Sequence, residues 1–276
     1  LCCTLTLADL VRLDSAYCCQ NRDYLVQSKP FTFHAPVNLS DTEQLQWLLN
    51  KEVKVSDVEF SLELVKVDEL RLSKYLRLYG SSIRTVHFIN GDNTQEMNLT
   101  AIHCRNLTKV CVAGTTLSIA FTNVLHYNPN IQRLECREVT SDLADLLEGL
   151  AMHKLQILHL SDFNCGILKG CAWHATTHSS SLHTAIVESC SFDDVDLRML
   201  FSNCPQLRSF SWTWAVGGGC MWEICASKMT GLVNLSVGAN GSMTDAGMLT
   251  IATNLTSATR SLTEPCCTSL STQAVR

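Results

Sequence analysis

A six-residue motif that is apolar at positions 1, 4 and 6 recurs along the chain. Its copies are IRTVHF from Ile83, LTKVCV from Leu107, IQRLEC from Ile131, LQILHL from Leu155, LHTAIV from Leu182, LRSFSW from Leu207 and LVNLSV from Leu232. Successive copies begin 24, 24, 24, 27, 25 and 25 residues apart. Side chains alternate along a strand, so positions 4 and 6 share one face. Each copy therefore predicts a short strand with one buried face, and a weaker copy, VSDVEF, begins at Val55.

The segments between the motifs place apolar residues at helical spacing. One such set is Leu143, Leu146, Leu147 and Leu150, and another lies between Glu43 and Leu49. A single strand and helix cannot bury an apolar face alone, so neighbouring units must stack. The interval between copies falls within the roughly 20–29 residues of leucine-rich repeats. The sequence therefore predicts an α/β leucine-rich-repeat solenoid, with a curved parallel sheet inside, helices outside and an N-terminal helical cap.

Two further motifs carry a resemblance to a known family. Asn203-Cys204-Pro205-Gln206-Leu207 places a "CPxL" step before one strand, and residues 243–249 (MTDAGML) resemble the helix that follows a strand in the same pattern. Residues 43–262 thus resemble the cysteine-containing, ribonuclease-inhibitor-like repeats of F-box and related ubiquitin-ligase proteins. The resemblance implies a protein–protein interaction module that recognises substrates for an SCF-type ubiquitin ligase.

The first thirty residues differ in character from the repeats. Residues 7–22 (LADLVRLDSAYCCQNR) are similar to the second half of an F-box, although the first F-box helix and the usual Trp after the Cys-Arg step are absent. The resemblance implies that Leu10 and Leu13 contact a Skp1-like adaptor. An ordinary capping helix is the alternative, because a solenoid must shield the apolar end of its first repeat. The chain begins with Leu rather than Met, so we expect an upstream segment.

These observations predict four regions. Residues 1–30 form an F-box-like or capping helical segment, and residues 31–42 form a linker. Residues 43–262 form the leucine-rich-repeat domain, and residues 263–276 form a disordered tail of mostly small polar residues.

Composition bears on the partners and the cellular compartment of the protein. The formal net charge of -5 indicates no general attraction to nucleic acid or to an anionic membrane. The fifteen cysteines are odd in number, and many lie in apolar runs where a thiol is a small buried hydrophobe. This favours a reducing compartment, cytoplasmic or nuclear. Several Asn-x-Ser/Thr triplets favour the alternative, an extracellular or receptor-type repeat domain.

Motifs for catalysis or metal binding are weak. Cys165, Cys171, His174 and His178 have ligand types that suit zinc, but they extend over the segment that lengthens one repeat to 27 residues, and no second CxxC pair exists. The glycine run at 217–219 lacks the Lys of a phosphate-binding loop, and neither GxSxG nor HExxH occurs. We therefore expect no enzyme activity, no cofactor and no metal.

The candidate binding surface is the side of the sheet that faces away from the core. Positions 2, 3 and 5 of each motif are expected to project from this concave side, which solenoids use for binding. Its charged and histidine residues are predicted to carry the site: Arg84, His87, Lys109, Arg133, Glu135, His159 and Arg208. Cations exceed carboxylates among them, so we expect the partner to present an acidic or phosphorylated protein segment.

Overall fold

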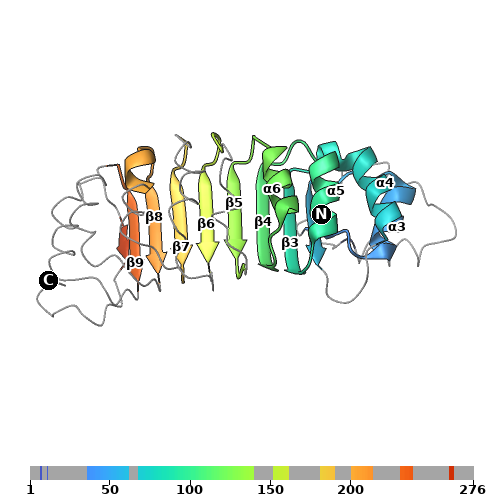
Figure 1. Cartoon of the computed structure of the whole chain (residues 1–276), viewed down its shortest axis with the longest axis horizontal. Coiled ribbons are helices and arrows are strands. Elements are labelled where there is room, and N and C mark those ends of the chain that lie inside the picture. The colour runs from blue at the N-terminus through green and yellow to red at the C-terminus, as the bar shows by residue number, and fades with distance from the viewer. Residues whose placement is uncertain are drawn as a thin grey trace, which may run out of the picture.

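A single parallel β-sheet runs through the molecule, with helices packed against one of its faces (Figure 1). The computed structural model describes residues 7, 11, 36–61, 68–139, 152–161, 181–189, 200–213, 231–238 and 261–263. Within these residues the sheet has ten strands in the order β1 to β10, and every neighbouring pair is parallel. Strands that follow one another in sequence are therefore neighbours in space.

Most strands occupy positions 3 to 7 of a motif. The strands are β1 (Val37–Asn38), β2 (Asp57–Ser61), β3 (Thr85–Gly91), β4 (Lys109–Thr115), β5 (Arg133–Arg137), β6 (Ile157–Ser161), β7 (Thr184–Glu188), β8 (Ser209–Thr213), β9 (Asn234–Gly238) and β10 (Ser261–Thr263). The prediction that the motifs from Ile83 to Leu232 form adjacent parallel strands is confirmed, since Val110 pairs with Leu134 and Leu134 pairs with Leu158.

Four described α-helices and one described 3-10 turn lie between the early strands, and three of the helices have a side-chain cap at the first turn. They are α3 (Thr42–Lys51), α4 (Glu69–Tyr79), the 3-10 turn η1 (Gly80–Ser82), α5 (Thr94–His103) and α6 (Ile119–His126). Side chains of Asp41, Asp68 and Ser118 accept hydrogen bonds from backbone N–H groups of the first turns of α3, α4 and α6. The helix predicted between Glu43 and Leu49 is confirmed as part of α3, whose Leu45 and Leu48 are buried.

The core lies between the sheet and the helices. Side chains at positions 4 and 6 are buried in every described copy from β2 to β8, and Trp212 on β8 is fully buried. Leu45, Leu72, Met97 and Phe121 from α3 to α6 belong to the same cluster. The alternation of the sequence motif thus corresponds to the two faces of the sheet.

A forked backbone contact sets the register at the start of each strand. The carbonyl of Arg84, at position 2, accepts hydrogen bonds from the N–H groups of Thr108 and Lys109, at positions 2 and 3 of the next copy. The same fork recurs from Ser56 to Val233, with distances between 2.8 and 3.1 Å. Equivalent positions of consecutive copies are therefore adjacent in the sheet.

Polar side chains just before the motifs tie each repeat to the one before it. At position -1, directly before position 1, Ser82 Oγ donates to the carbonyl of Val55 (3.1 Å) and Asn106 Nδ2 to that of Ser81 (3.0 Å). Lys154 Nζ donates to Asn130 Oδ1 (2.6 Å), and Ser181 Oγ donates to the carbonyl of His153 (2.8 Å). These bonds join residues 24 to 28 apart in sequence.

At position -3 a residue can lie close against the next repeat. From the Ile83 copy onwards its described occupants, all buried, are Gly80, Cys104, Asn128, Met152 and Cys204. A Cβ atom on Gly80 would lie 2.7 Å from the carbonyl oxygen of His103, so only glycine fits without a backbone shift. Asn128 satisfies three backbone groups: Nδ2 donates to the carbonyls of Cys104 and Val124, and Oδ1 accepts from the N–H of Leu107.

The chain turns out of several strands through a left-handed residue at position 8. Asn90, Gly114, Glu138 and Ser189 have φ between 50° and 59°. Gly and Asn adopt this region with little cost, whereas Glu and Ser are unusual there. The bend belongs to the repeat geometry and does not depend on one residue type.

The predicted linker at residues 31–42 requires a correction. Its residues Val37 and Asn38 form β1, which pairs with β2, and Val37 and Leu39 are buried. The sheet therefore begins before residue 43. The motif search missed this strand because it is two residues long and His34 occupies the apolar position 1. At the other end, β10 extends to Thr263, one residue past the predicted domain end.

Some expectations fall on residues outside the described part of the chain. These are the helix at Leu143–Leu150, the zinc candidates, the glycine run, and Leu10 and Leu13. Within the N-terminal segment, Leu7 and Val11 are helical; Leu7 is buried and Val11 packs against the core.

The register makes a stability prediction for the central repeat. Leu158 at position 4 is 1% exposed, so Leu158→Ala should lower the free energy of unfolding by roughly 2–5 kcal/mol, as large-to-small core substitutions do. Ile157, its neighbour on the same strand, faces the other side of the sheet and is only partly buried. Ile157→Ala is the matched control and should cost clearly less. Denaturant unfolding measures both, and equal losses would contradict the register.

Candidate binding face

The side chains at positions 3, 5 and 7 form three rows across the face of the sheet opposite the helices, which we term the free face. Their partial exposure alternates with the buried positions 4 and 6 along β2, β3, β7 and β8, and at positions 3 and 5 of β6, whereas Ser161 at position 7 of β6 is buried. Register places Thr85, Lys109, Arg133 and Ile157 side by side in the first row. His87, Cys111, Glu135 and His159 are neighbours in the second row.

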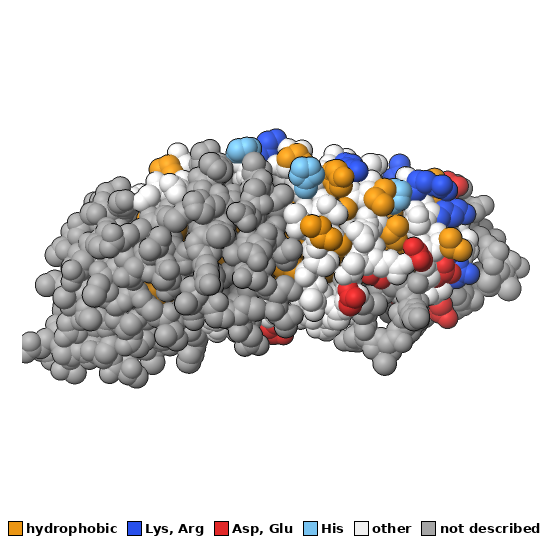
Figure 2. Space-filling view, viewed as in Figure 1, with side chains coloured by type: hydrophobic (Ala, Val, Ile, Leu, Met, Phe, Trp, Pro, Cys, Tyr) orange, Lys and Arg blue, Asp and Glu red, His pale blue; other side chains and the backbone are white. Residues whose placement is uncertain are grey.

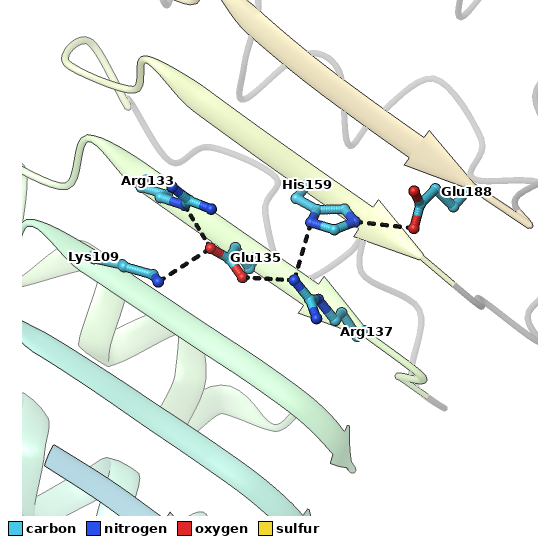
Figure 3. A network of polar contacts seen from close by, with 6 residues as sticks. All are labelled: Lys109, Arg133, Glu135, Arg137, His159 and Glu188. Atoms are coloured by element: carbon cyan, nitrogen blue, oxygen red, sulfur yellow. Dashed lines mark hydrogen bonds and ion pairs between the residues drawn. The ribbon is translucent and has the colours of Figure 1, made fainter. Parts of the chain in front are cut away.

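Three cations surround one carboxylate on β4 and β5. Oε1 of Glu135 accepts from Nε of Arg133 and lies 3.3 Å from Nζ of Lys109, and Oε2 accepts from Nη2 of Arg137 at 3.1 Å (Figure 3). The Glu135 side chain is 7% exposed, whereas those of Lys109, Arg133 and Arg137 are 30%, 42% and 49% exposed. We call these three cations the basic cluster. The carboxylate lies at its base, and the guanidinium groups border the solvent.

The basic cluster controls the protonation of Glu135. Burial alone would raise the pKa of this carboxyl group, but the nearby charges of Lys109 and Arg133, together with their hydrogen bonds, lower it below its ordinary value near 4.5. Glu135 is therefore ionised at neutral pH. One carboxylate accepts from three cations that supply many more N–H donors than it has acceptor sites, so the cluster keeps a net positive charge and an excess of donors.

His159 extends this network to β7. Its Nδ1 lies 3.4 Å from Nη2 of Arg137, and its Nε2 lies 3.2 Å from Oε2 of Glu188 (Figure 3). Arginine has donors only, so Nδ1 of His159 must be the acceptor in this contact. With Nδ1 as the acceptor, Nε2 is the donor to Glu188.

The basic cluster has different neighbours on its two sides. Towards the N-terminus, Nε2 of His87 lies 3.1 Å from Oδ1 of Asp57, without hydrogen-bond geometry, and Glu59 adds a second carboxylate on β2. Towards the C-terminus, the odd positions of β8 and β9 are small or uncharged: Ser209, Ser211, Thr213, Asn234, Ser236 and Gly238. The positive charge is therefore confined to the middle of the free face.

Five of the seven predicted site residues lie on this face: His87, Lys109, Arg133, Glu135 and His159. Arg84 and Arg208 do not lie within a strand, because β3 and β8 begin one residue later. Both are exposed at the edge where the strands begin, and Arg84 Nη1 donates to the carbonyl of Asn106. Position 2 therefore belongs to this edge, which corrects the expectation that it projects with positions 3 and 5.

Sequence reasoning missed Arg137, Glu188 and Asp57. Arg137 and Glu188 occupy position 7, one residue beyond the six-residue motif, on the same face as positions 3 and 5. Asp57 belongs to the weaker copy at Val55, whose odd positions were not included in the predicted surface. A predicted surface that included position 7 and the copy at Val55 would have contained all three residues.

The described cysteines are buried thiols. Cys104, Cys111, Cys136 and Cys204 form no disulfide with one another. Burial raises the pKa of Cys104 and Cys111 to about 12 and that of Cys204 to about 11. Even Cys111, which lies on the free face between His87 and Glu135, is therefore a protonated and weakly nucleophilic group.

The described residues offer little indication of a metal site or a membrane-spanning segment. They contain no group of three or more His, Cys, Asp or Glu side chains arranged to hold a metal ion. No described helix is long and apolar enough to cross a membrane. No protein-family model and no curated protein matches the chain.

The depressed pKa of Glu135 makes stability depend on pH. Because the folded pKa lies below the unfolded one, the carboxylate stabilises the native state above the unfolded pKa, and this contribution is lost as the pH falls through the folded pKa. Glu135→Gln should therefore cost about 1–3 kcal/mol near neutral pH, as for a hydrogen-bonded charge, and less in acid. Chemical denaturation of both proteins between about pH 7 and about pH 3.5 measures the difference.

Glu138→Gln is the control, because Glu138 is exposed and lies just beyond the same strand. Its effect should be small at every pH. A Glu135→Gln deficit that stays constant or grows towards low pH would contradict the assigned role of the cluster.

Proposed function

We propose that the chain is a leucine-rich-repeat protein whose free face binds an acidic or phosphorylated segment of a partner protein. The strand-by-strand sheet, the repeat interval of 24 to 27 residues and the helices on one face support the repeat assignment. The observation that carries the binding proposal is the basic cluster, whose three cations border the solvent around one buried carboxylate.

The chemistry of the cluster suits an oxyanion. Arg133 and Arg137 come from the same strand, four residues apart, and both contact the carboxylate of Glu135 between them. Guanidinium groups bind carboxylate and phosphate with pairs of N–H donors, and charge-assisted bonds are stronger than neutral ones. A partner oxyanion would supply acceptors for the donors that Glu135 leaves over. The uncharged positions on β8 and β9 would accommodate the neutral part of the same segment.

The resemblance to F-box proteins gives this module a place in an assembly. In this proposal the repeats hold a substrate for an SCF-type ubiquitin ligase, and the N-terminal segment holds a Skp1-like adaptor. The helical residues Leu7 and Val11 support a segment that packs on the repeats, as both a capping helix and a half F-box would. The buried, unpaired thiols at Cys104, Cys111, Cys136 and Cys204 favour a cytoplasmic or nuclear setting over an extracellular receptor.

Peptide binding tests the free face. The probe is an immobilised library of phosphoserine peptides with its unphosphorylated twin. We expect the wild-type chain to select phosphorylated or Asp/Glu-rich members. The double variant Arg133→Gln/Arg137→Gln should lose at least about tenfold in affinity, since each charge-assisted bond contributes about 1.5–3 kcal/mol.

The matched control for this experiment is Arg84→Gln/Arg208→Gln, which removes two arginines from the strand-start edge. It should bind the selected peptides as the wild type does. Preference for neutral peptides, or equal loss in both double variants, would rule out the basic cluster as the binding site.

The adaptor prediction concerns residues 5–22. A chain extended by its native upstream sequence should bind a Skp1-like adaptor in a pull-down, and Leu10→Ala/Leu13→Ala should abolish the binding. Circular dichroism of both proteins checks that the repeats remain folded. Absence of binding by the extended wild-type chain would leave the capping-helix interpretation alone.

A further inference from the structure

The C-terminal ends of the helices α4, α5 and α6 form a second exposed surface, which differs from the free face in being partly apolar. Five large apolar side chains in the described part of the chain are exposed, and three of them lie where these helices end: Leu78 (52%), Ile102 (56%) and Tyr127 (45%). Leu78 and Ile102 occupy the same place in consecutive repeats, 24 residues apart, and Tyr127 lies 25 residues further on. Stacking therefore brings them onto one strip of surface.

Arginine and histidine side chains frame this apolar strip. Arg77, Arg105 and His126 are exposed beside it, and His103 is partly exposed. The guanidinium carbon of Arg105 lies 4.0 Å from the centroid of the Tyr127 ring, and the ring of His126 meets the same tyrosine edge-on at 5.3 Å. Figure 2 shows Lys, Arg and His side chains along the upper margin of this face, with hydrophobic side chains between them. We call Leu78, Ile102 and Tyr127, together with Arg77, His103 and Arg105, the helix-end patch.

Burial and the neighbouring arginines both act on His103, which lies within the helix-end patch. Burial lowers the pKa of His103, and the charges of Arg77 and Arg105 lower it further. Arg77 lies in the last turn of α4, where its charge balances the negative end of the helix dipole. Arg105 lies beyond the end of α5 and adds charge outside the helix itself.

Acidic residues gather at the opposite ends of the same helices. Asp68 and Glu69 begin α4, and Asp92 precedes α5. Among the described residues from 70 to 139, the carboxylates are Asp92, Glu96, Glu135 and Glu138, and none of them lies near a helix C-terminus. The ends of α4, α5 and α6 are therefore apolar and basic, and the described acid at a neighbouring helix end is Glu52, the exposed C-cap residue of α3.

We propose that the helix-end patch is a docking site for an amphipathic segment of a partner protein, with apolar anchors flanked by acidic residues. Aromatic and arginine side chains dominate binding energy at protein interfaces, and Tyr127 and Arg105 already form an ordered pair. Leu78 and Ile102 supply apolar contact area that a phosphate backbone would not use. The sequence pI of about 6.0 and the acidic opposite helix ends also disfavour nucleic acid and anionic membranes as partners.

The test is selection from a phage-displayed random peptide library on the wild-type chain. Peptides that also bind the double variant Ile102→Ser/Arg105→Glu are first removed. The remaining peptides should combine Leu, Ile, Phe or Trp with Asp or Glu, and the single variants Ile102→Ser and Arg105→Glu should each weaken them at least about tenfold. Ile119→Ser is the matched control, since Ile119 is 73% exposed at the other end of α6. It should leave binding unchanged.

Three outcomes would overturn the proposal. In the first, no peptide distinguishes the wild-type chain from the double variant. In the second, Ile119→Ser weakens the selected peptides as much as Ile102→Ser does. In the third, a polyuridylate RNA or a phosphatidylserine vesicle binds the wild-type chain and competes with the peptides. Arg133→Gln/Arg137→Gln separates this site from the free face, because peptides held by the helix-end patch should not respond to it.

Discussion

The backbone pairing of neighbouring strands is the constraint on which this molecule depends. Most strands have only five residues, and each satisfies its N–H and C=O groups through the repeat before it and the repeat after it. The forked contact at the start of each strand fixes the relative position of two repeats to a single residue. All side-chain rows across the free face follow from this register, because equivalent positions have no freedom to slide past one another.

Because each row places equivalent side chains next to one another, like charges in neighbouring repeats destabilise the sheet. Lys109 and Arg133 are direct neighbours in the sheet, and Arg137 lies four residues further along β5. Cations directly across from each other destabilise a sheet unless a counter-charge lies between them. Glu135 meets this need from the adjacent row, and its own burial is tolerated because three cations compensate for its lost hydration. Binding chemistry and folding stability are therefore coupled at this point.

The sequence predicted the sheet well because its signal is repeated. One apolar residue such as Val110, Leu134 or Leu158 does not predict a strand by itself. Their identical spacing predicts both the strands and the register between them. From register alone, Lys109, Arg133 and Glu135 were correctly placed together.

The misses arose where a local feature departs from the period. Arg84 and Arg208 were assigned to the face although the fork leaves position 2 outside the strand. Polar contacts between repeats, such as that of His159 with Glu188, depend on side-chain lengths and rotamers. The left-handed bends at Glu138 and Ser189 could not be predicted, because neither residue type favours that conformation.

The polar bonds at position -1 have a consequence for how such a chain gains or loses repeats in evolution. Each joins residues 24 to 28 apart, about one repeat, so addition or removal of a complete unit keeps the position before one strand beside the same part of the preceding repeat, whereas an insertion at a strand start would shift the residues that form the fork.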